Sequence, residues 1–421
     1  MKNVLYISYL FPPMAGGGVY RVVKTLKYLP AFGWNPSVLT VKNHHHWVTD
    51  HTLLKELPLD LTVQRTYCLD PFYLYALLDK TGMKSIRHVI EEYLAIPDNK
   101  LGWFLTALIK GLCLIRKNNI DLIFSTSPPH STHMIAYVLK KITGKPWVAE
   151  FRDHMSLNPL RNTVPPLRLA IEKNMEKRFL ADASRVITVT EGNRDDIINL
   201  FGVEDTKVVV VPNGFDPSDF EGLDKIFTKD RKCFTMTYTG SLYGTRTPRV
   251  FLDAVQKILT YHPELRGKFS VNIIGKIEDK FKGLCEGEGL KDVVHFYEFL
   301  DHREAISHMI NSHILILLIS SGGTNSNVLT GKIFEYMASG TPILALVPDG
   351  IAKQLIEDSR TGFTVDPDNA EALSEKIYEL YKRWESGKLT TNPNWDVIKR
   401  YERKSLTQAL AAEFDSIVMG S

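Results

Sequence analysis

The sequence predicts an α/β protein with two parallel sheets, each wrapped by helices. Short runs rich in β-branched and aromatic residues alternate with helical patterns along the chain, which is typical of parallel strands joined by crossover helices. The alternation runs twice, on either side of the turn-rich segment VVVVPNGFDPSDF (208–220). A length of 421 residues suits two large domains rather than one.

The expected strands and helices follow the chain in order. In the first half, the strand-like runs are VLYISY, PSVLTV, DLIFSTS, PWVAEF and RVITVT, and the helical stretches are 19–32, 131–143 and 165–182. In the second half, the strand-like runs are FTMTYTG, FSVNIIG, VVHFYEF, HILILLI and TPILALV, and the helical stretches are 248–261, 302–310, 331–339 and 370–386. We predict domains over 1–205 and 206–394, with a helical segment over 395–421 that returns to the first domain.

Composition and charge exclude several classes of protein. Apolar residues make up 44% and charged residues 24% of the chain, an ordinary globular balance rather than a disordered one. The net charge of +3 carries no nucleic-acid signal. Residues 1–200 hold a surplus of basic residues and residues 201–421 a surplus of acidic ones. A basic first half suits an anionic partner, such as a phospholipid surface or a lipid-phosphate acceptor; chance solvation of two unlike surfaces is the alternative.

Cysteines and hydrophobic runs indicate a reducing, cytoplasmic setting. The four cysteines are scattered without a C-x-x-C pair, so we expect neither a disulfide framework nor a zinc site. The opening MKNVLYISYLF leads at once into PP and GGG, which indicates a first strand and its loop rather than a signal peptide. No run approaches the ~20 apolar residues that a transmembrane helix needs.

Residues 71–118 break the alternation with a long helical pattern rich in aromatic residues. Within 101–117 an apolar set falls near helical spacing and is flanked by basic residues: Leu101, Phe104, Leu105, Leu108, Leu112 and Ile115, with Lys110, Arg116 and Lys117. A helix of this kind can lie in a membrane interface, which places the inner face of the membrane among the candidate locations. The alternative is that the apolar face packs on the sheet.

Three glycines, Gly16, Gly17 and Gly18, stand directly before the first helical pattern. Glycine lets backbone N–H groups approach a ligand, and a helix start carries partial positive charge. The loop therefore suits a phosphate or developing negative charge. It lacks the spacing of a dinucleotide fingerprint and the G-K-[ST] ending of a P-loop. A tight turn without a ligand is the alternative.

The densest signal is GGTNSNVLTGKIFEYMASGTPIL (322–344). Thr330, Gly331 and Lys332 stand where a helix begins, so backbone N–H groups and an ammonium can hold a diphosphate there. Glu335 follows at i+3 on the same helix face, where a carboxylate can accept two hydrogen bonds from a ribose diol. A surface Lys–Glu pair is the alternative.

Six segments, in this order, resemble the retaining glycosyltransferases of family 4, or group 1. They are YLFPPMAGGGVYR, DLIFSTSPPHST followed by PWVAEFRD, VITVTEG, VVPNGFD, TYTGSLYGTRTP and TGKIFEYMASGTPIL. The resemblance covers nearly the whole chain. It implies the GT-B fold, in which two Rossmann-like domains face each other across a cleft. The first domain would then take the acceptor, and the second the nucleotide sugar.

The resemblance also assigns roles to individual residues. Glu335 matches the glutamate that holds the nucleotide ribose. Lys332 and the backbone of Leu329, Thr330 and Gly331 match the diphosphate cradle. Arg246 falls where a basic residue contacts the donor phosphates, whereas Ser241 stands where the family often has a second one. Gly17 and Gly18 match the loop that faces the leaving phosphate and the acceptor.

Two departures from the family pattern concern the sugar. Asn327 stands where a sugar-contacting glutamate is common, and an amide brings hydrogen bonds without charge. Thr126 stands where many members have a histidine, and His130, a few residues on, is a candidate substitute; capping of a helix is its alternative role. Arg152 and Asp153 end the next strand, where ligands of open α/β sheets bind, unless they only pair with each other.

Together these observations predict a metal-independent hexosyltransferase, because Lys332, Arg246 and the N–H groups of the helix start would stabilise the charge on the departing diphosphate in place of a metal. The expected donor is a nucleotide sugar, with a UDP-sugar favoured. The expected acceptor is a glycan or a lipid-phosphate-linked glycan in cell-surface polysaccharide or glycoconjugate synthesis. The family implies retention of anomeric configuration. An epimerase of the same architecture and a non-catalytic scaffold are the alternatives, and a dehydrogenase fits least because neither half has a dinucleotide fingerprint.

Overall fold

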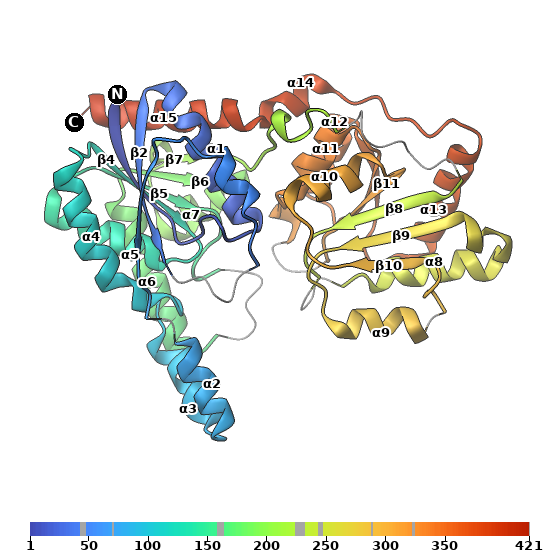
Figure 1. The fold of residues 1–421 in the computed structure, drawn as a ribbon, viewed down its shortest axis with the longest axis horizontal. Helices are drawn as coiled ribbons and strands as arrows, with labels where there is room; N and C mark the ends of the chain where they lie inside the picture. The colour runs from blue at the N-terminus through green and yellow to red at the C-terminus, as the bar shows by residue number, and fades with distance from the viewer. Residues whose placement is uncertain are drawn as a thin grey trace. The chain divides into compact units, whose positions relative to one another are not determined.

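The chain forms two compact units in the computed structural model (Figure 1). The structure describes residues 1–42, 48–69, 71–157, 164–223, 232–242, 247–287, 289–321 and 325–420. The first unit is Met1–Pro212 with Arg403–Ser421, and the second is Asn213–Glu402. The sequence predicted these boundaries at 205/206 and 394/395, and the boundaries between the two units lie seven and eight residues further along the chain.

The first unit holds a parallel sheet of seven strands in the order β3-β2-β1-β4-β5-β6-β7. Their bounds are β1 Lys2–Ile7, β2 Trp34–Val41, β3 Thr62–Thr66, β4 Leu122–Ser127, β5 Trp147–Phe151, β6 Arg185–Thr188 and β7 Val208–Val210. The strand order reverses between β1 and β4, which is where open α/β sheets bind ligands. The short β3 was missing from the sequence prediction, since its five residues are only half-buried or exposed.

Helices cover both faces of this sheet. They are α1 Gly17–Tyr28, α4 Phe104–Lys117, α5 Ser131–Thr143, α6 Pro166–Asp182, α7 Glu191–Phe201 and α15 Arg403–Met419. Along β1, Leu5 and Ile7 pack into one core and Val4 and Tyr6 into the other, because alternate side chains of a strand point to opposite faces. The C-terminal α15 joins the first unit through Phe414, whose ring stands edge-on to Trp34 at 5.3 Å between centroids.

The second unit holds a parallel sheet of six strands in the order β10-β9-β8-β11-β12-β13. The strands are β8 Phe234–Thr239, β9 Phe269–Ile274, β10 Val294–Tyr297, β11 Ile314–Leu318, β12 Ile343–Leu346 and β13 Gly362–Val365. The helices are α8 Arg249–Tyr261, α9 Asp279–Gly287, α10 His302–Ile310, α11 Lys332–Ser339, α12 Ile351–Ser359, α13 Ala370–Glu385 and α14 Trp395–Ile398. The α/β class with two parallel sheets is confirmed.

The segment that breaks the alternation forms a helical arm, residues 71–100, in the first unit. It contains α2 Phe72–Lys80, α3 Lys84–Val89 and the π-helical turn Ile90–Leu94. In Figure 1, α2 and α3 project away from the sheet. Within the described ranges, no helix is both long and apolar enough to cross a bilayer.

Helix α4 follows the arm and carries the apolar face that the sequence offered to a membrane. Four of the six predicted residues of that face, Phe104, Leu108, Leu112 and Ile115, pack against the core of the first unit. Gly111 allows close approach to α5, because a Cβ there would lie 2.8 Å from Leu139 Cδ1. Leu105 stays exposed. Most of this face therefore stabilises the fold.

Candidate active site

The glycine loop of the first unit leads from β1 into α1. Gly16 adopts a φ of 121°, which only glycine takes readily, and it caps the helix that begins at Gly17. A Cβ at Gly18 would lie 2.7 Å from Nη1 of Arg152. The guanidinium of Arg152 therefore lies directly against the backbone of the glycine loop.

Backbone carbonyls hold Arg152 in this place. Its Nε donates to the carbonyl of Ser127 at 2.7 Å and its Nη2 to that of Pro128 at 3.1 Å, and the side chain is only 9% exposed. Burial lowers the pKa of Arg152, and the charges of Glu150 and Asp153 oppose that shift. The sequence singled out Asp153 beside it, and Asp153 lies exposed. The structure thus brings Arg152, more than Asp153, to the glycine loop.

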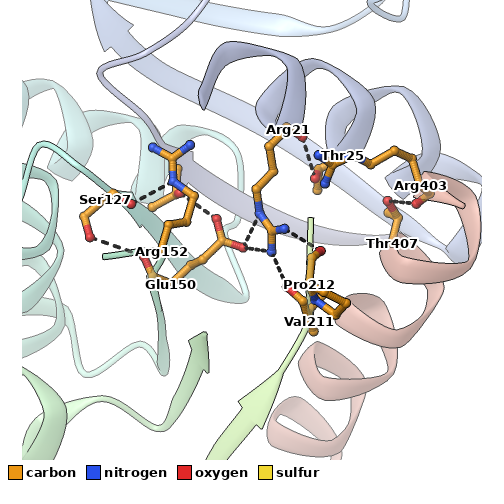
Figure 2. Close-up of polar contacts among 10 residues, drawn as sticks. Arg21, Thr25, Ser127, Glu150, Arg152, Val211, Pro212, Arg403 and Thr407 are labelled. Atoms are coloured by element: carbon orange, nitrogen blue, oxygen red, sulfur yellow. Dashed lines mark hydrogen bonds and ion pairs between the residues drawn. The ribbon is translucent and has the colours of Figure 1, made fainter. Parts of the chain in front are cut away.

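Glu150 is the centre of a buried ionic cluster that the sequence analysis did not predict. Its Oε1 accepts hydrogen bonds from Nε and Nη2 of Arg21, at 3.0 and 2.7 Å, and its Oε2 accepts one from Thr126 at 2.6 Å. Arg21 also donates to the carbonyls of Val211 and Pro212 (Figure 2). The hydroxyl of Thr126, the residue that replaces the expected histidine, is therefore committed to Glu150.

His130 stands at the N-terminus of α5 and is buried. It lines a cavity of about 520 Å³ together with Tyr9, Leu10 and Asp98. Its Nδ1 has no hydrogen-bond partner in the part of the chain that the structure describes. Burial lowers the pKa of His130 below its ordinary value, so the imidazole is neutral at physiological pH.

The neighbouring His133 has a structural role instead. Its Nδ1 lies 2.8 Å from Ser125 Oγ, and its ring packs on Phe151 with 4.2 Å between centroids. The indole of Trp147 donates to the same Ser125 hydroxyl. Of the two histidines in this loop and helix, only His130 lines the cavity.

In the second unit, Lys332 is the first residue of α11. Its Nζ lies 3.9 Å from the centroid of the Tyr238 ring. A Cβ at Gly240 would come within 2.6 Å of that Nζ, and a Cβ at Gly275 within 2.6 Å of the Gly240 carbonyl oxygen. Both glycines are therefore needed for the lysine to lie at the carboxyl end of β8. The sequence analysis missed these two glycines, because only the fold brings them beside Lys332.

Glu335 lies one helical turn after Lys332 and is held by a histidine. Its Oε1 lies 2.9 Å from Nε2 of His302, the first residue of α10. Nδ1 of the same histidine lies 3.9 Å from Asp219 Oδ2. The carboxylate is 16% exposed and the imidazole 8%. His302 was not predicted, since 33 residues separate it from Glu335.

The other predicted donor residues lie around the start of α11. Leu329 packs against the core of the second unit, and the carbonyl of Thr330 accepts the N–H of Ile333 at 3.2 Å. Oγ1 of Thr330 is buried without a hydrogen-bond partner among the described residues. Gly331 caps the helix, and no described atom lies within 4 Å of a Cβ there.

Three further predictions concern the edges of this site. Asn327 ends the 3-10 helix Asn325–Asn327 and is half-buried. Gly350 lets the chain pass beside that turn, because a Cβ there would lie 2.2 Å from the Ser326 carbonyl oxygen. The carbonyl of Ser241 accepts a hydrogen bond from the Tyr238 hydroxyl at 3.3 Å. Arg246 lies outside the described residues.

Two family models divide the chain between them. Glycosyltransferase Family 4 matches residues 15–219, and Glycosyl transferases group 1 matches residues 219–392. Two parallel-sheet units matched in this order define a glycosyltransferase of the GT-B class. The chain belongs to glycosyltransferase family 4, the group 1 glycosyltransferases.

Individual proteins support the same class. The D-inositol 3-phosphate glycosyltransferase of Actinosynnema mirum is 25% identical over 228 residues, which cover 48% of this chain and 52% of that protein. The chain thus spans about half the length of the curated relatives it matches. Sucrose-phosphate synthase of Thermosynechococcus elongatus aligns with a TM-score of 0.70 at 14% identity over 100% of both chains. Anabaena HepE in complex with UDP-glucose aligns with a TM-score of 0.68 at 16% identity, over 99% of this chain and 100% of that one. These structures share the fold.

Proposed function

We propose that the protein transfers a sugar from a nucleotide-diphosphate sugar, with a UDP-sugar favoured, to a glycan or lipid-linked acceptor. The observation that carries the proposal is the first turn of α11. It places Lys332 and Glu335 one helical turn apart, with the ammonium against Gly240 and the carboxylate against His302. A fold-level likeness to a structure with bound UDP-glucose supports this choice of donor.

Each end of the donor has a proposed partner in the second unit. Lys332 and the backbone N–H groups of Leu329 to Gly331 would neutralise the diphosphate, because a helix start and an ammonium both favour negative charge. Glu335 would accept hydrogen bonds from the ribose hydroxyls, with His302 holding its carboxylate in place. Arg246 and Ser241 are proposed at the phosphates, and Asn327 at the sugar. In the first unit, Gly16 to Gly18 and Arg152 are proposed to face the leaving phosphate.

The chemistry proposed is retention by attack on the same face of the sugar. A double displacement needs a carboxylate nucleophile beside the anomeric carbon, and the position proposed there holds Asn327. The departing phosphate would instead take the acceptor proton, while Lys332 stabilises the charge that develops on it. No metal is required in this scheme. A covalent glycosyl-enzyme trapped and located by mass spectrometry would contradict it.

Nucleotide binding is the first expected result. UDP in a buffer containing EDTA should raise the melting temperature of the intact chain, because a ligand at 100 times its Kd adds about 2.7 kcal/mol of stability. Glu335→Ala should need about 10- to 100-fold more UDP for the same shift, since a buried ribose contact is lost. Glu375→Ala, at an exposed glutamate of the same unit, is the control. The proposal fails if UDP, GDP and ADP all leave the wild-type melting temperature unchanged.

An anionic membrane surface is the second partner proposed, and the arm is its site. Helices α2 and α3 and the turn between them expose an apolar set, Leu74, Leu77, Met83, Ile86 and Val89. Exposed Lys80 and Lys84 lie among them, and of the acidic side chains of the arm, Asp79 and Glu91 pair with Arg87. Apolar side chains beside exposed basic side chains are typical of interfacial helices.

Sedimentation with vesicles tests this surface. Wild-type protein should co-sediment with vesicles of phosphatidylglycerol and phosphatidylcholine at low salt, and less at high salt, because the Debye length shortens. The pair Leu77→Glu and Ile86→Glu should reduce the bound fraction at least fivefold by putting two carboxylates against the anionic surface. Leu200→Glu, at an exposed leucine of α7, should bind as the wild type does. Equal binding by all three proteins would remove the arm as the membrane site.

A further inference from the structure

The cavity that His130 lines is walled by the base of the arm. On one side lie Tyr9 and Leu10, which follow β1; on the second lie Pro128 to His130, which follow β4; the third side is the segment Glu91 to Lys100. Its volume of about 520 Å³ falls within the range of small-molecule sites, roughly 300–1,000 Å³. The segment that breaks the α/β alternation therefore forms one wall of a half-open cavity at the switch point of the first sheet.

Buried polar contacts hold this wall at two points. Arg168 of α6 is 7% exposed and donates to the carbonyls of Glu91 and of Ala95, the latter at 3.1 Å, while its Nε donates to Glu172 at 2.7 Å. The carboxylate of Asp98 accepts hydrogen bonds from the backbone N–H of Ser131 at 2.8 Å and from the Ser131 hydroxyl at 2.6 Å. Arg168 is buried and Asp98 is half-buried, and their hydrogen bonds attach the wall to α6 and α5.

The charges of the lining disfavour an anion. Three carboxylates, those of Glu91, Glu92 and Asp98, line the cavity against the two cations Lys100 and Arg168. Asp98 also occupies the N-terminus of α5, the place where a helix would otherwise attract a phosphate. Arg168 is committed to Glu172 and the carbonyls of the wall. Glu91 is paired with Arg87, so a phosphate in this cavity would meet the carboxylates of Glu92 and Asp98 while Arg168 is held by other groups.

The lining suits a neutral ring with hydroxyl groups. Apolar surface comes from Leu10, Ala95, Pro97, Pro129 and Met155. The imidazole of His130 carries a buried Nδ1 that lacks a partner within the described ranges, and an uncharged imidazole can donate one hydrogen bond and accept another. A sugar ring presents both an apolar face and hydroxyl groups to such a site.

We infer that this cavity binds the acceptor as an uncharged sugar ring, with any phosphate of a lipid carrier outside it, and that the arm is the element selecting that ring. The inference rests on the proposed glycosyl transfer. The cavity adjoins the glycine loop, because Leu10 lines it and a Cβ at Gly18 would lie 2.7 Å from Leu10 Cδ1. The carbonyl of Pro128, another lining residue, holds Arg152. An acceptor hydroxyl at this end would lie beside the groups proposed to face the leaving phosphate.

The experiment follows the His130 ring in the full-length protein labelled with ¹³C at histidine. The His130 Cε1–H signal is assigned with His130→Gln. The probes are the methyl pyranosides of glucose, galactose, mannose and N-acetylglucosamine, and glycerol 3-phosphate as the anion. At least one pyranoside should shift the His130 signal and leave that of His133 unmoved. Glycerol 3-phosphate should shift neither.

Two variants locate the binding. Ala95→Phe fills the cavity while keeping the carbonyl that Arg168 contacts, and should weaken pyranoside binding at least tenfold. Ala31→Phe, at an exposed alanine of the same unit, should bind as the wild type does. The inference is overturned if none of the four pyranosides moves the signal, if glycerol 3-phosphate moves it at lower concentration, or if Ala95→Phe binds normally. UDP-induced stabilisation is measured on the same samples, so a failure of the proposed donor binding is seen separately.

Discussion

Replacing Lys332 by alanine is expected to lower kcat/KM for the nucleotide sugar by about 10²- to 10³-fold, the usual cost of losing one group that stabilises transition-state charge. The ammonium is confined between the Tyr238 ring and the backbone of Gly240, so little reorganisation is needed when the diphosphate departs. The measurement is initial rate against donor concentration, with UDP release as the readout. The loss should lie mainly in kcat, because charge on the phosphate grows as the sugar bond breaks.

Two further variants make this result specific. Lys353→Ala, at an exposed lysine of α12 that pairs with Asp349, should keep the wild-type rate. Gly240→Ala should lose activity with Lys332 still present, because its Cβ would displace the ammonium. A Lys332→Ala protein within threefold of the wild-type kcat would exclude Lys332 from charge stabilisation.

Replacing Glu150 by alanine is expected to destabilise the first unit by about 3–5 kcal/mol, the cost of leaving buried charge without its partner. Arg21 would keep its carbonyl contacts but lose its carboxylate, and Arg152 would lose a nearby negative charge. Hydrogen exchange of amides in β4 and β5 measures the stability of the first unit separately from that of the second. Glu191→Ala, at an exposed glutamate of α7, should change the protection by less than about 0.5 kcal/mol.

The carboxyl of Glu150 also predicts that folding stability depends on pH. Burial by itself would raise the pKa of Glu150, but Arg21, Arg152 and the Thr126 hydroxyl hold it below its ordinary value. A carboxyl with a lowered pKa in the folded state stabilises that state fully above its unfolded pKa. This stability is lost as pH falls below the ordinary value and through the folded one. Glu150→Gln should reduce the loss of folding stability at acid pH. An unchanged dependence of stability on pH would mean that other groups cause the loss.

Local patterns in the sequence were sufficient for the class of fold and for placing Lys332 and Glu335 at the start of one helix. Alternating strand and helix runs predict parallel sheets wherever the runs are long and buried, as in β4 and β11. The spacing of Lys332 and Glu335 predicts a shared helix face from helical geometry alone. The short β3 and β13 were missed because their burial is only partial, which weakens the hydrophobic pattern.

The sequence by itself therefore determined two parallel sheets, the order of the motifs and the residues at the start of α11, since periodicity is a property of neighbours in the chain. Only the tertiary structure decided which distant residues contact the residues of these motifs. His302 reaches Glu335, Thr126 is bound to Glu150, and Gly240 leaves room for Lys332. It also decided that the arm walls a cavity. Such contacts depend on strand order and close packing, which join residues far apart in sequence and leave no local pattern.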